Sequence, residues 1–193
     1  KTIEGEFEEG LPLSVLVSDR LSAQLKTPAQ THQVCLAHLL REIIFIEEVE
    51  AHPFAPAFNN LLKSIFEFKK NQTCNYVVNS LETKPFEEKL NKLLAMPISK
   101  NDYPKTVTFQ NSMIKVRNYI LPCLYRKDIP PDNNGSERAV RNVKVKQKIS
   151  GQFKTGQNAF CILRSVIDTV KKRKYDIMNT LNQIMLVYPK MQP

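Results

Sequence analysis

The stretch PPDNNGSERAVRNVKVKQK, residues 130–148, divides the chain into two kinds of sequence. Its paired prolines, Pro130 and Pro131, end the helical pattern before them, because proline lacks a backbone N–H and restricts the backbone. The next five residues, 132–136, are turn and capping types that predict a helix beginning near Glu137. One carboxylate, that of Glu137, therefore stands before a run of cations that contains no other acid.

The positive charge of the chain is concentrated after this stretch. The whole chain of 193 residues has a formal net charge of +9, whereas residues 138–174 alone carry eleven Lys or Arg and one acid, Asp168. Local basicity outside an apolar amphipathic face favours a polyanionic partner, nucleic acid before membrane. The alternative is a solvated lysine-rich surface.

Composition indicates a soluble cytoplasmic protein. The length suits one domain, or a compact core with an insertion, and the apolar content of 42% is ordinary. No apolar run approaches the roughly 18 residues of a membrane span, and no signal peptide is evident. The four cysteines, at positions 35, 74, 123 and 161, form no Cys-x-x-Cys pair, and we expect reduced thiols. Because the chain starts at Lys1 rather than methionine, we expect a fragment of a longer protein.

Hydrophobic periodicity predicts two strands followed by helices. A Val- and Leu-rich run at 13–18 predicts a buried strand that ends at Asp19, and 32–37 predicts a second strand. Helices are expected over 39–46, from Pro53, from Thr83 and over 106–121, which makes the middle of the chain all-helical.

After the prolines, the pattern predicts three more helices. The first starts near Glu137, and the second follows the glycine-bearing loop SGQFKTGQ, residues 150–157. The third extends to Leu186 and is capped by Asp176. The apolar residues of the second helix are expected to face inward; they are Phe160, Leu163, Val166, Ile167 and Val170.

Two carboxylates occupy positions from which a fold can direct them into one cleft. Asp19 follows a strand, and Glu137 lies in the first turn of a helix. Gathered carboxylates bind hard divalent cations, as in two-metal phosphoryl-transfer sites. Taken singly, each also has a structural interpretation, Glu137 as a helix-dipole acid and Asp19 as a turn cap.

A second candidate metal cluster is His32, Cys35 and His38, in the pattern His-x-x-Cys-x-x-His. A structural zinc site needs four ligands, and no second ligand pair is present, although Cys74 or Cys123 could approach. We therefore favour Cys35 as a core residue, with metal binding as the alternative.

The cations after Glu137 are candidate DNA contacts. Arg138, Arg141 and Lys144 share one helical face, whereas Lys144, Lys146 and Lys148 alternate as in an extended segment that follows a phosphate backbone. Lys154 in the next loop is assigned to the same set. Without interleaved aromatic residues, non-specific phosphate contact is expected, and a solvated helix face is the alternative.

Three motifs together resemble a known family. They are VSDR at 17–20, HQVCLAHLLRE at 32–42, and DNNGSERAVRNVKVKQKISGQFKTGQNAFCILRSVIDTVKKRKYDIMNTL at 132–181. They are similar to the sixty-six family of bacterial insertion-sequence transposases, from about residue 10 to about residue 185. The most specific element is Asp-Asn-Asn-x-x-Glu-Arg-x-x-Arg.

The resemblance implies a ribonuclease H-like core of the Asp-Asp-Glu type that holds two Mg²⁺ (or Mn²⁺) ions. Asp19 corresponds to the second aspartate and Glu137 to the glutamate, with 117 residues between them. The expected fold is α/β and mostly helical, a partial ribonuclease H-like core with a large all-helical insertion. Its expected segments are 1–41 (partial core), 42–126 (insertion) and 127–193 (the C-terminal part of the core).

The resemblance also implies the function: metal-dependent cleavage of transposon ends and transfer of the 3′-hydroxyl into target DNA. Expected partners are double-stranded DNA and further copies of the chain on that DNA, in the bacterial cytoplasm at the nucleoid and not at a membrane. The family's first aspartate lies upstream of Asp19, and residues 1–18 contain none, so we expect the chain alone to be inactive. The alternatives are a non-enzymatic DNA-binding module and a structure-specific nuclease of the same fold.

Overall fold

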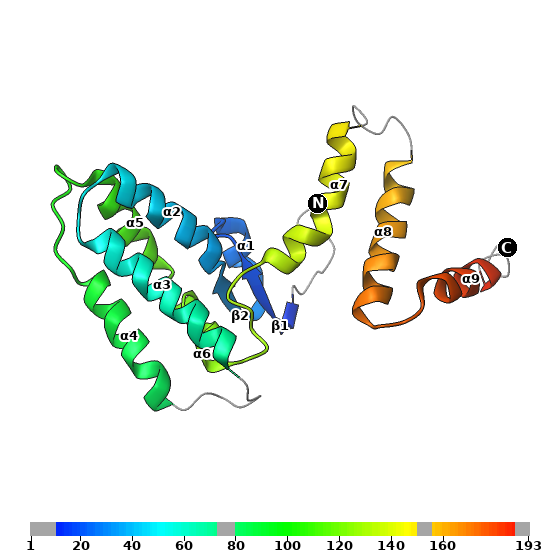
Figure 1. Ribbon diagram of the computed structural model, residues 1–193, viewed down its shortest axis with the longest axis horizontal. Helices are drawn as coiled ribbons and strands as arrows, with labels where there is room; N and C mark the ends of the chain where they lie inside the picture. Colours follow the sequence, from blue (N-terminus) through cyan, green and yellow to red (C-terminus); the bar gives the residue numbers. More distant parts are fainter. Residues whose placement is uncertain (1–10, 73–79, 150–155, 188–193) are drawn as a thin grey trace. The chain divides into compact units, whose positions relative to one another are not determined.

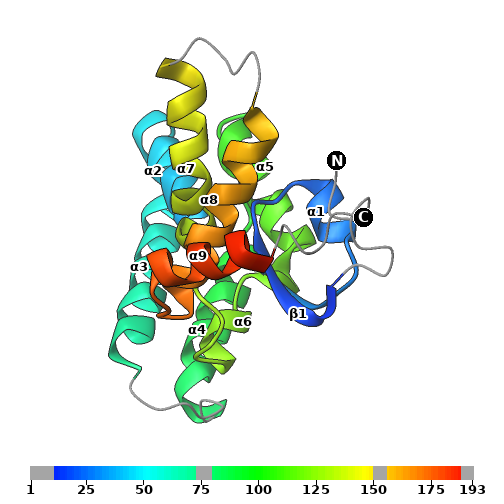
Figure 2. The same cartoon turned by 90° about the vertical axis from the view of Figure 1, so that its right-hand side faces the viewer.

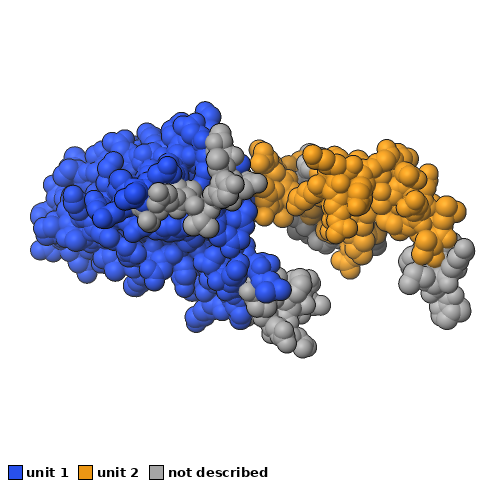
Figure 3. All heavy atoms as spheres, turned by 90° about the horizontal axis from the view of Figure 1, so that it is seen from below, with its two compact units in different colours: residues 1–133 blue, residues 134–193 orange. Residues whose placement is uncertain are grey.

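A computed structural model describes residues 11–72, 80–149 and 156–187. It divides into two compact units, residues 1–133 and 134–193, which are coloured separately in Figure 3. The described part is mostly helical with a small parallel sheet, so the predicted α/β, mostly helical class is confirmed. The ribonuclease H-like core and the division at residues 41 and 126 stay predictions.

The first unit begins with the two-stranded parallel sheet. Strand β1 (Leu11–Ser18) pairs with β2 (Ala29–Val34) in the register Val15 to Thr31 and Ser18 to Val34. A short helix, α1 (Ser22–Lys26), lies in the connection between the two strands. The prediction of β2 at 32–37 is wrong at both ends, because helix α2 already begins at Leu36.

The rest of the first unit is helical, as predicted. The elements are α2 (Leu36–Val49), α3 (Phe54–Asn71), α4 (Ser80–Leu94), α5 (Pro104–Lys115), the 3-10 helix η2 (Arg117–Tyr119) and α6 (Pro122–Tyr125). The predicted continuous helix over 106–121 is wrong. Val116 leaves helical geometry (φ −108°, ψ 16°), and Pro122 cannot donate to a helix that continues from before it. Helix α4 starts three residues before the predicted Thr83.

One hydrophobic core joins the sheet to the helices. Phe54, Phe58 and Phe109 are fully buried, with the Phe58 and Phe109 rings 5.2 Å apart edge to face. Val34 belongs to the same core, and Val17 packs against it from β1. Figures 1 and 2 show the strand pair on one side of the block that helices α2 to α6 form. The shared core therefore fixes the carboxyl ends of both strands against the helical block.

A buried amide ties the end of β2 to the segment before α6. Gln33 is fully buried, and its Nε2 donates to the carbonyls of Val34 (2.8 Å) and Ile120 (3.0 Å). Its Oε1 accepts the backbone N–H of Cys123 at 2.7 Å. Because α6 starts at Pro122, this N–H belongs to the first turn, where no helical carbonyl is available. Gln33 therefore supplies a partner that the local backbone cannot.

The second unit contains α7 (Asn134–Ile149), α8 (Gln157–Lys172) and α9 (Ile177–Val187). Helix α7 starts three residues before the predicted Glu137. The predicted cap of the last helix is confirmed, because Oδ1 of Asp176 accepts the N–H of Asn179 at 2.7 Å. Of the residues predicted to face inward on α8, Val170 is buried, but Leu163 is 48% exposed, so the prediction is wrong for Leu163.

Candidate metal and DNA site

Asp19 is placed by the end of the sheet. In a parallel pair the carboxyl ends of both strands lie at the same edge, and here Ser18 pairs with Val34. The backbone N–H of Cys35 donates to the Ser18 carbonyl at 2.9 Å, so the residues after the two strands, Asp19 and Cys35, are neighbours. Helix α2 starts at once and brings His38 to the same point.

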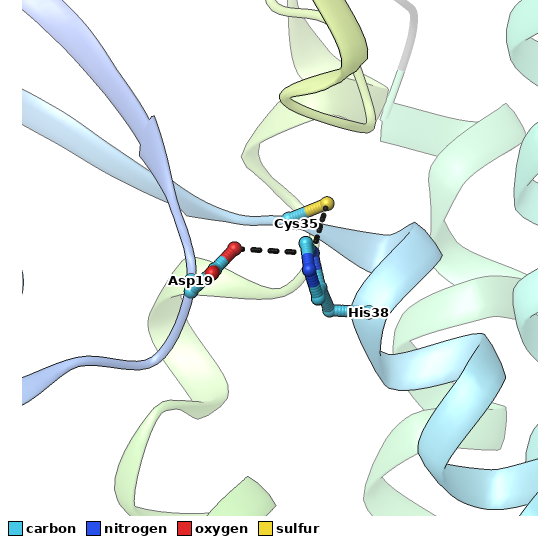
Figure 4. Close-up of side chains that lie close together, drawn as sticks. All are labelled: Asp19, Cys35 and His38. Atoms are coloured by element: carbon cyan, nitrogen blue, oxygen red, sulfur yellow. Dashed lines mark hydrogen bonds and ion pairs between the residues drawn. The ribbon is translucent and has the colours of Figure 1, made fainter. Parts of the chain in front are cut away.

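Three side chains meet at this edge, as Figure 4 shows. Nδ1 of His38 lies 3.0 Å from Oδ1 of Asp19 and 3.1 Å from Sγ of Cys35. Cys35 is fully buried, whereas half of the Asp19 side chain and about a third of the His38 side chain are exposed. The cluster therefore has a buried sulfur on one side and solvent on the other.

The turn at 130–133, at the start of the stretch PPDNNGSERAVRNVKVKQK, docks against the same edge. The Pro131 carbonyl accepts the N–H of Leu36, the first residue of α2, at 2.9 Å. Nδ2 of Asn133 donates to Oδ1 of Asp19 at 3.2 Å, across 114 positions of sequence. Two segments that the sequence singled out separately are thus hydrogen-bonded to each other.

The two oxygens of Asp19 have different surroundings. Oδ1 faces both His38 and Asn133. Among the described residues, no hydrogen bond or ion pair reaches Oδ2. One oxygen is therefore held by the protein, and the other is available to a ligand.

The residue after Asp19 anchors the loop to the helical block. The guanidinium of Arg20 forms an ion pair with Glu42 on α2, donates to Oγ of Ser112 on α5, and lies 5.8 Å from the Phe109 ring centre. A guanidinium that bonds to residues on two helices leaves the loop that carries it little freedom. Arg20 therefore helps to fix the direction of the Asp19 side chain.

His32 does not join the cluster. It is buried at 7% exposure within β2, and its ring lies 5.3 Å from that of Tyr119. Its Nδ1 has no hydrogen-bond partner among the described residues. The cluster of His32, Cys35 and His38 is thus corrected to Asp19, Cys35 and His38, while the prediction that Cys35 is a core residue is confirmed by its complete burial.

Of the two cysteines considered as further ligands for the alternative zinc site, Cys123 does not approach the cluster. Cys123 is buried away from the cluster, and desolvation raises the pKa of its thiol to about 12. Burial disfavours the thiolate, and Cys123 is not among the residues whose ligand atoms gather at the cluster. Cys74, the other candidate, lies outside the described residues.

Glu137 and the predicted cations are described within the second unit. Glu137 is in the first turn of α7 and is exposed, as are Arg138, Arg141, Lys144 and Lys148. At about 100° per residue, these five residues lie within an arc of roughly 120° on α7. The acid and four of the cations therefore share one face of the helix, and Nε of Arg138 also donates to the Asn134 carbonyl at 3.3 Å.

The predicted extended segment through Lys144, Lys146 and Lys148 is wrong. Helix α7 continues to Ile149, because no glycine or proline interrupts 136–149 and its Lys, Arg and Gln residues favour helix. Helical geometry places Lys146 about 160° away from Lys144 around α7, off the shared face. Lys154 lies outside the described residues.

Comparison with known proteins gives one match. The family model of the IS66 family of transposases matches residues 3–160. No curated protein and no solved structure matches the chain. Within residues 11–72, 80–149 and 156–187, none of the helices has the length and apolar character needed to cross a membrane.

Proposed function

The chain belongs to the IS66 transposase family, and we propose that it supplies part of a centre that cleaves the ends of a DNA element and joins the released 3′-hydroxyl to target DNA. One observation carries this proposal. The Asp-Asn-Asn motif and the strand-end aspartate meet through the bond from Asn133 to Asp19. Only three residues separate Asn133 from Glu137 in the sequence. The motif that carries one carboxylate, Glu137, therefore includes a residue that is hydrogen-bonded to the other, Asp19.

The surroundings of Asp19 fit a hard divalent cation. Its Oδ1 is oriented by His38 and Asn133, its side chain is half exposed, and its Oδ2 makes no bond within the described residues. Carboxylate oxygens are the preferred protein ligands of Mg²⁺ and Mn²⁺. Asp19 and Glu137 would hold two such ions together with a further aspartate, which residues 1–18 do not contain.

The bound ions would supply activation of the attacking oxygen and stabilisation of the leaving oxygen. The protein's own residues position these groups. His38 and Asn133 keep the Asp19 carboxylate in one orientation, and Arg138 and Arg141, on the face that carries Glu137, would neutralise DNA phosphates. Contacts to phosphates carry no direct sequence information, which suits a catalytic centre that acts on many targets.

The larger assembly follows from the same proposal. Asp19 and Glu137 would belong to a ribonuclease H-like core, with residues 42–126 as its helical insertion. Joining two transposon ends to one target requires the enzyme to hold two DNA ends, so it would act as a homo-oligomer on double-stranded DNA.

A strand-transfer assay tests this function against its alternatives. The full-length protein is incubated with Mg²⁺, a labelled duplex carrying one end of the element, and a supercoiled plasmid. We expect labelled end covalently joined to plasmid. Cleavage without joining would instead indicate a structure-specific nuclease, and binding without cleavage a DNA-binding module.

A further inference from the structure

Cys35 is the member of the cluster that the proposed Mg²⁺ chemistry does not use. Its sulfur lies 3.1 Å from Nδ1 of His38, and the ligand atoms of Asp19, Cys35 and His38 all lie within 4.8 Å of one another. Mg²⁺ takes oxygen ligands and has little affinity for sulfur. The buried sulfur beside the carboxylate therefore offers this edge of the sheet a ligand for metal ions other than Mg²⁺.

The spacing suits a small tetrahedral ion. Zinc bonds of about 2.0 Å to nitrogen and oxygen and about 2.3 Å to sulfur separate tetrahedral ligand atoms by roughly 3.3–3.6 Å. The two contacts of His38 Nδ1, at 3.0 and 3.1 Å, need to open by only a few tenths of an ångström. The third pair, Asp19 and Cys35, lies within 4.8 Å and closes onto the ion through a shift of the Asp19 side chain, which is half exposed.

The ligand types select the metal. One thiolate, one imidazole nitrogen and one carboxylate oxygen form a set typical of Zn²⁺, with the fourth position left to solvent on the exposed side. Binding would release the Cys35 thiol proton to solvent, because the thiolate is the ligand. We infer that Asp19, Cys35 and His38 form a site for a thiophilic divalent cation of the Zn²⁺ class, which competes with Mg²⁺ for Asp19.

The competition has a regulatory consequence that rests on the proposed function. A Zn²⁺ ion on Asp19 uses the carboxylate that the Mg²⁺ centre needs and brings the wrong coordination number for it. Zinc-class ions therefore inhibit DNA cleavage even when Mg²⁺ is in large excess. The binding itself requires only the three side chains in the first unit.

Titration of the 193-residue chain with Co²⁺ in excess Mg²⁺ tests the binding directly. We expect one Co²⁺ per chain, with a thiolate-to-cobalt charge-transfer absorption that Zn²⁺ removes by displacement. Cys35→Ser abolishes the absorption, and His38→Gln, at a partly exposed position, weakens Co²⁺ binding about 10- to 100-fold. The matched control Cys161→Ser, on α8, leaves both unchanged.

Circular dichroism of each variant checks that the fold is retained, and His38→Gln decides the test if Cys35→Ser fails to fold. The inference is overturned if no charge-transfer absorption forms, or if a folded Cys35→Ser or His38→Gln variant binds Co²⁺ as wild type does.

A second measurement uses cleavage by the full-length protein, with each variant compared with its own zinc-free rate. The Zn²⁺ concentration for half-inhibition should rise at least about tenfold in Cys35→Ser. Binding without inhibition refutes the regulatory consequence, whereas absence of any cleavage refutes the proposed function and leaves the metal site to the Co²⁺ titration.

Discussion

Replacement of Gln33 by leucine should destabilise the first unit strongly, although the two side chains have similar volumes. Gln33 is fully buried, and its amide is the partner of the Ile120 carbonyl and of the Cys123 N–H. Leucine fills the space and therefore adds little cavity cost. It leaves both of these backbone groups buried without that partner, since Ile120 and Cys123 are themselves fully buried.

The expected cost follows from those two groups. Leaving a buried donor or acceptor unsatisfied costs about 1–3 kcal/mol each, and the apolar transfer of leucine offsets part of the sum. We therefore expect the free energy of unfolding to fall by about 2–4 kcal/mol. With a urea slope of about 2 kcal/mol per M, the midpoint should fall by roughly 1–2 M.

Urea unfolding followed by circular dichroism measures this change. The matched control is Gln30→Leu, on the same strand but with an exposed side chain that accepts one hydrogen bond from Arg126. This control should lie within about 0.5 kcal/mol of wild type. A Gln33→Leu variant as stable as Gln30→Leu would show that the buried amide does not hold β2 to the segment before α6.

Three further predictions concern the helical block, the positioning of Asp19 and DNA binding. Desolvation raises the pKa of Glu50, but hydrogen bonds from the Thr106 hydroxyl, the Thr106 N–H and the Lys105 N–H outweigh it and lower the pKa below its ordinary 4.5. A carboxyl group whose pKa is lowered by folding stabilises the fold above its unfolded-state pKa, and this stabilisation is lost as the pH falls. Glu50→Gln should therefore cost about 1 kcal/mol at pH 7, and the stability difference between wild type and variant, measured by thermal unfolding, should shrink below about pH 4.5. A difference that stays constant with pH would contradict the capping role. Asn133→Ala should reduce metal-dependent cleavage about 10- to 100-fold while DNA affinity, measured by anisotropy, stays within twofold, because it removes a donor to Oδ1 of Asp19; unchanged cleavage would show that this bond does not orient the carboxylate. Arg141→Gln should weaken DNA binding and reduce the slope of log affinity against log salt by about one, whereas Lys63→Gln on α3 should change neither, and an unchanged slope for Arg141→Gln would exclude the phosphate contact.

The first strand and its terminal aspartate were predictable because they depend on local pattern. A short Val- and Leu-rich run that stops at a charged residue favours a strand, and β1 ends at Ser18, directly before Asp19. The prediction that this strand is buried is wrong at its start, because Leu13 is 91% exposed. The cap of the last helix by Asp176 was predictable for the same reason, since a capping side chain bonds only to its own first turn.

The cluster at the sheet edge was not predictable from spacing alone. His32, Cys35 and His38 have a regular separation in sequence, but β2 ends at Val34 and α2 begins at Leu36, so the separation spans two kinds of backbone. The third member, Asp19, comes from another strand through parallel pairing. A signal was nevertheless present, because two parallel strands bring the residues that follow them to one edge.

The errors at helix ends have a common cause. The predicted helix over 106–121 follows apolar periodicity, which continues across Val116 although the backbone breaks there. The predicted extended segment after Lys144 relied on lysines at every second position, but this alternation is short and lies in a stretch without glycine or proline, through which α7 continues to Ile149. In both regions, the helix propensity and the allowed backbone angles of the individual residues decided where the helix ends.

The most direct measurement of the central claim is Mg²⁺-dependent end cleavage by the full-length protein carrying Asp19→Asn or Glu137→Gln. The matched control is Glu82→Gln, because Glu82 also lies exposed in the first turn of a helix, α4. If Asp19 and Glu137 hold the catalytic ions, each of their variants loses at least about 100-fold in cleavage rate while DNA binding persists and the control stays at the wild-type rate. Cleavage at the wild-type rate by either Asp19→Asn or Glu137→Gln would contradict the account.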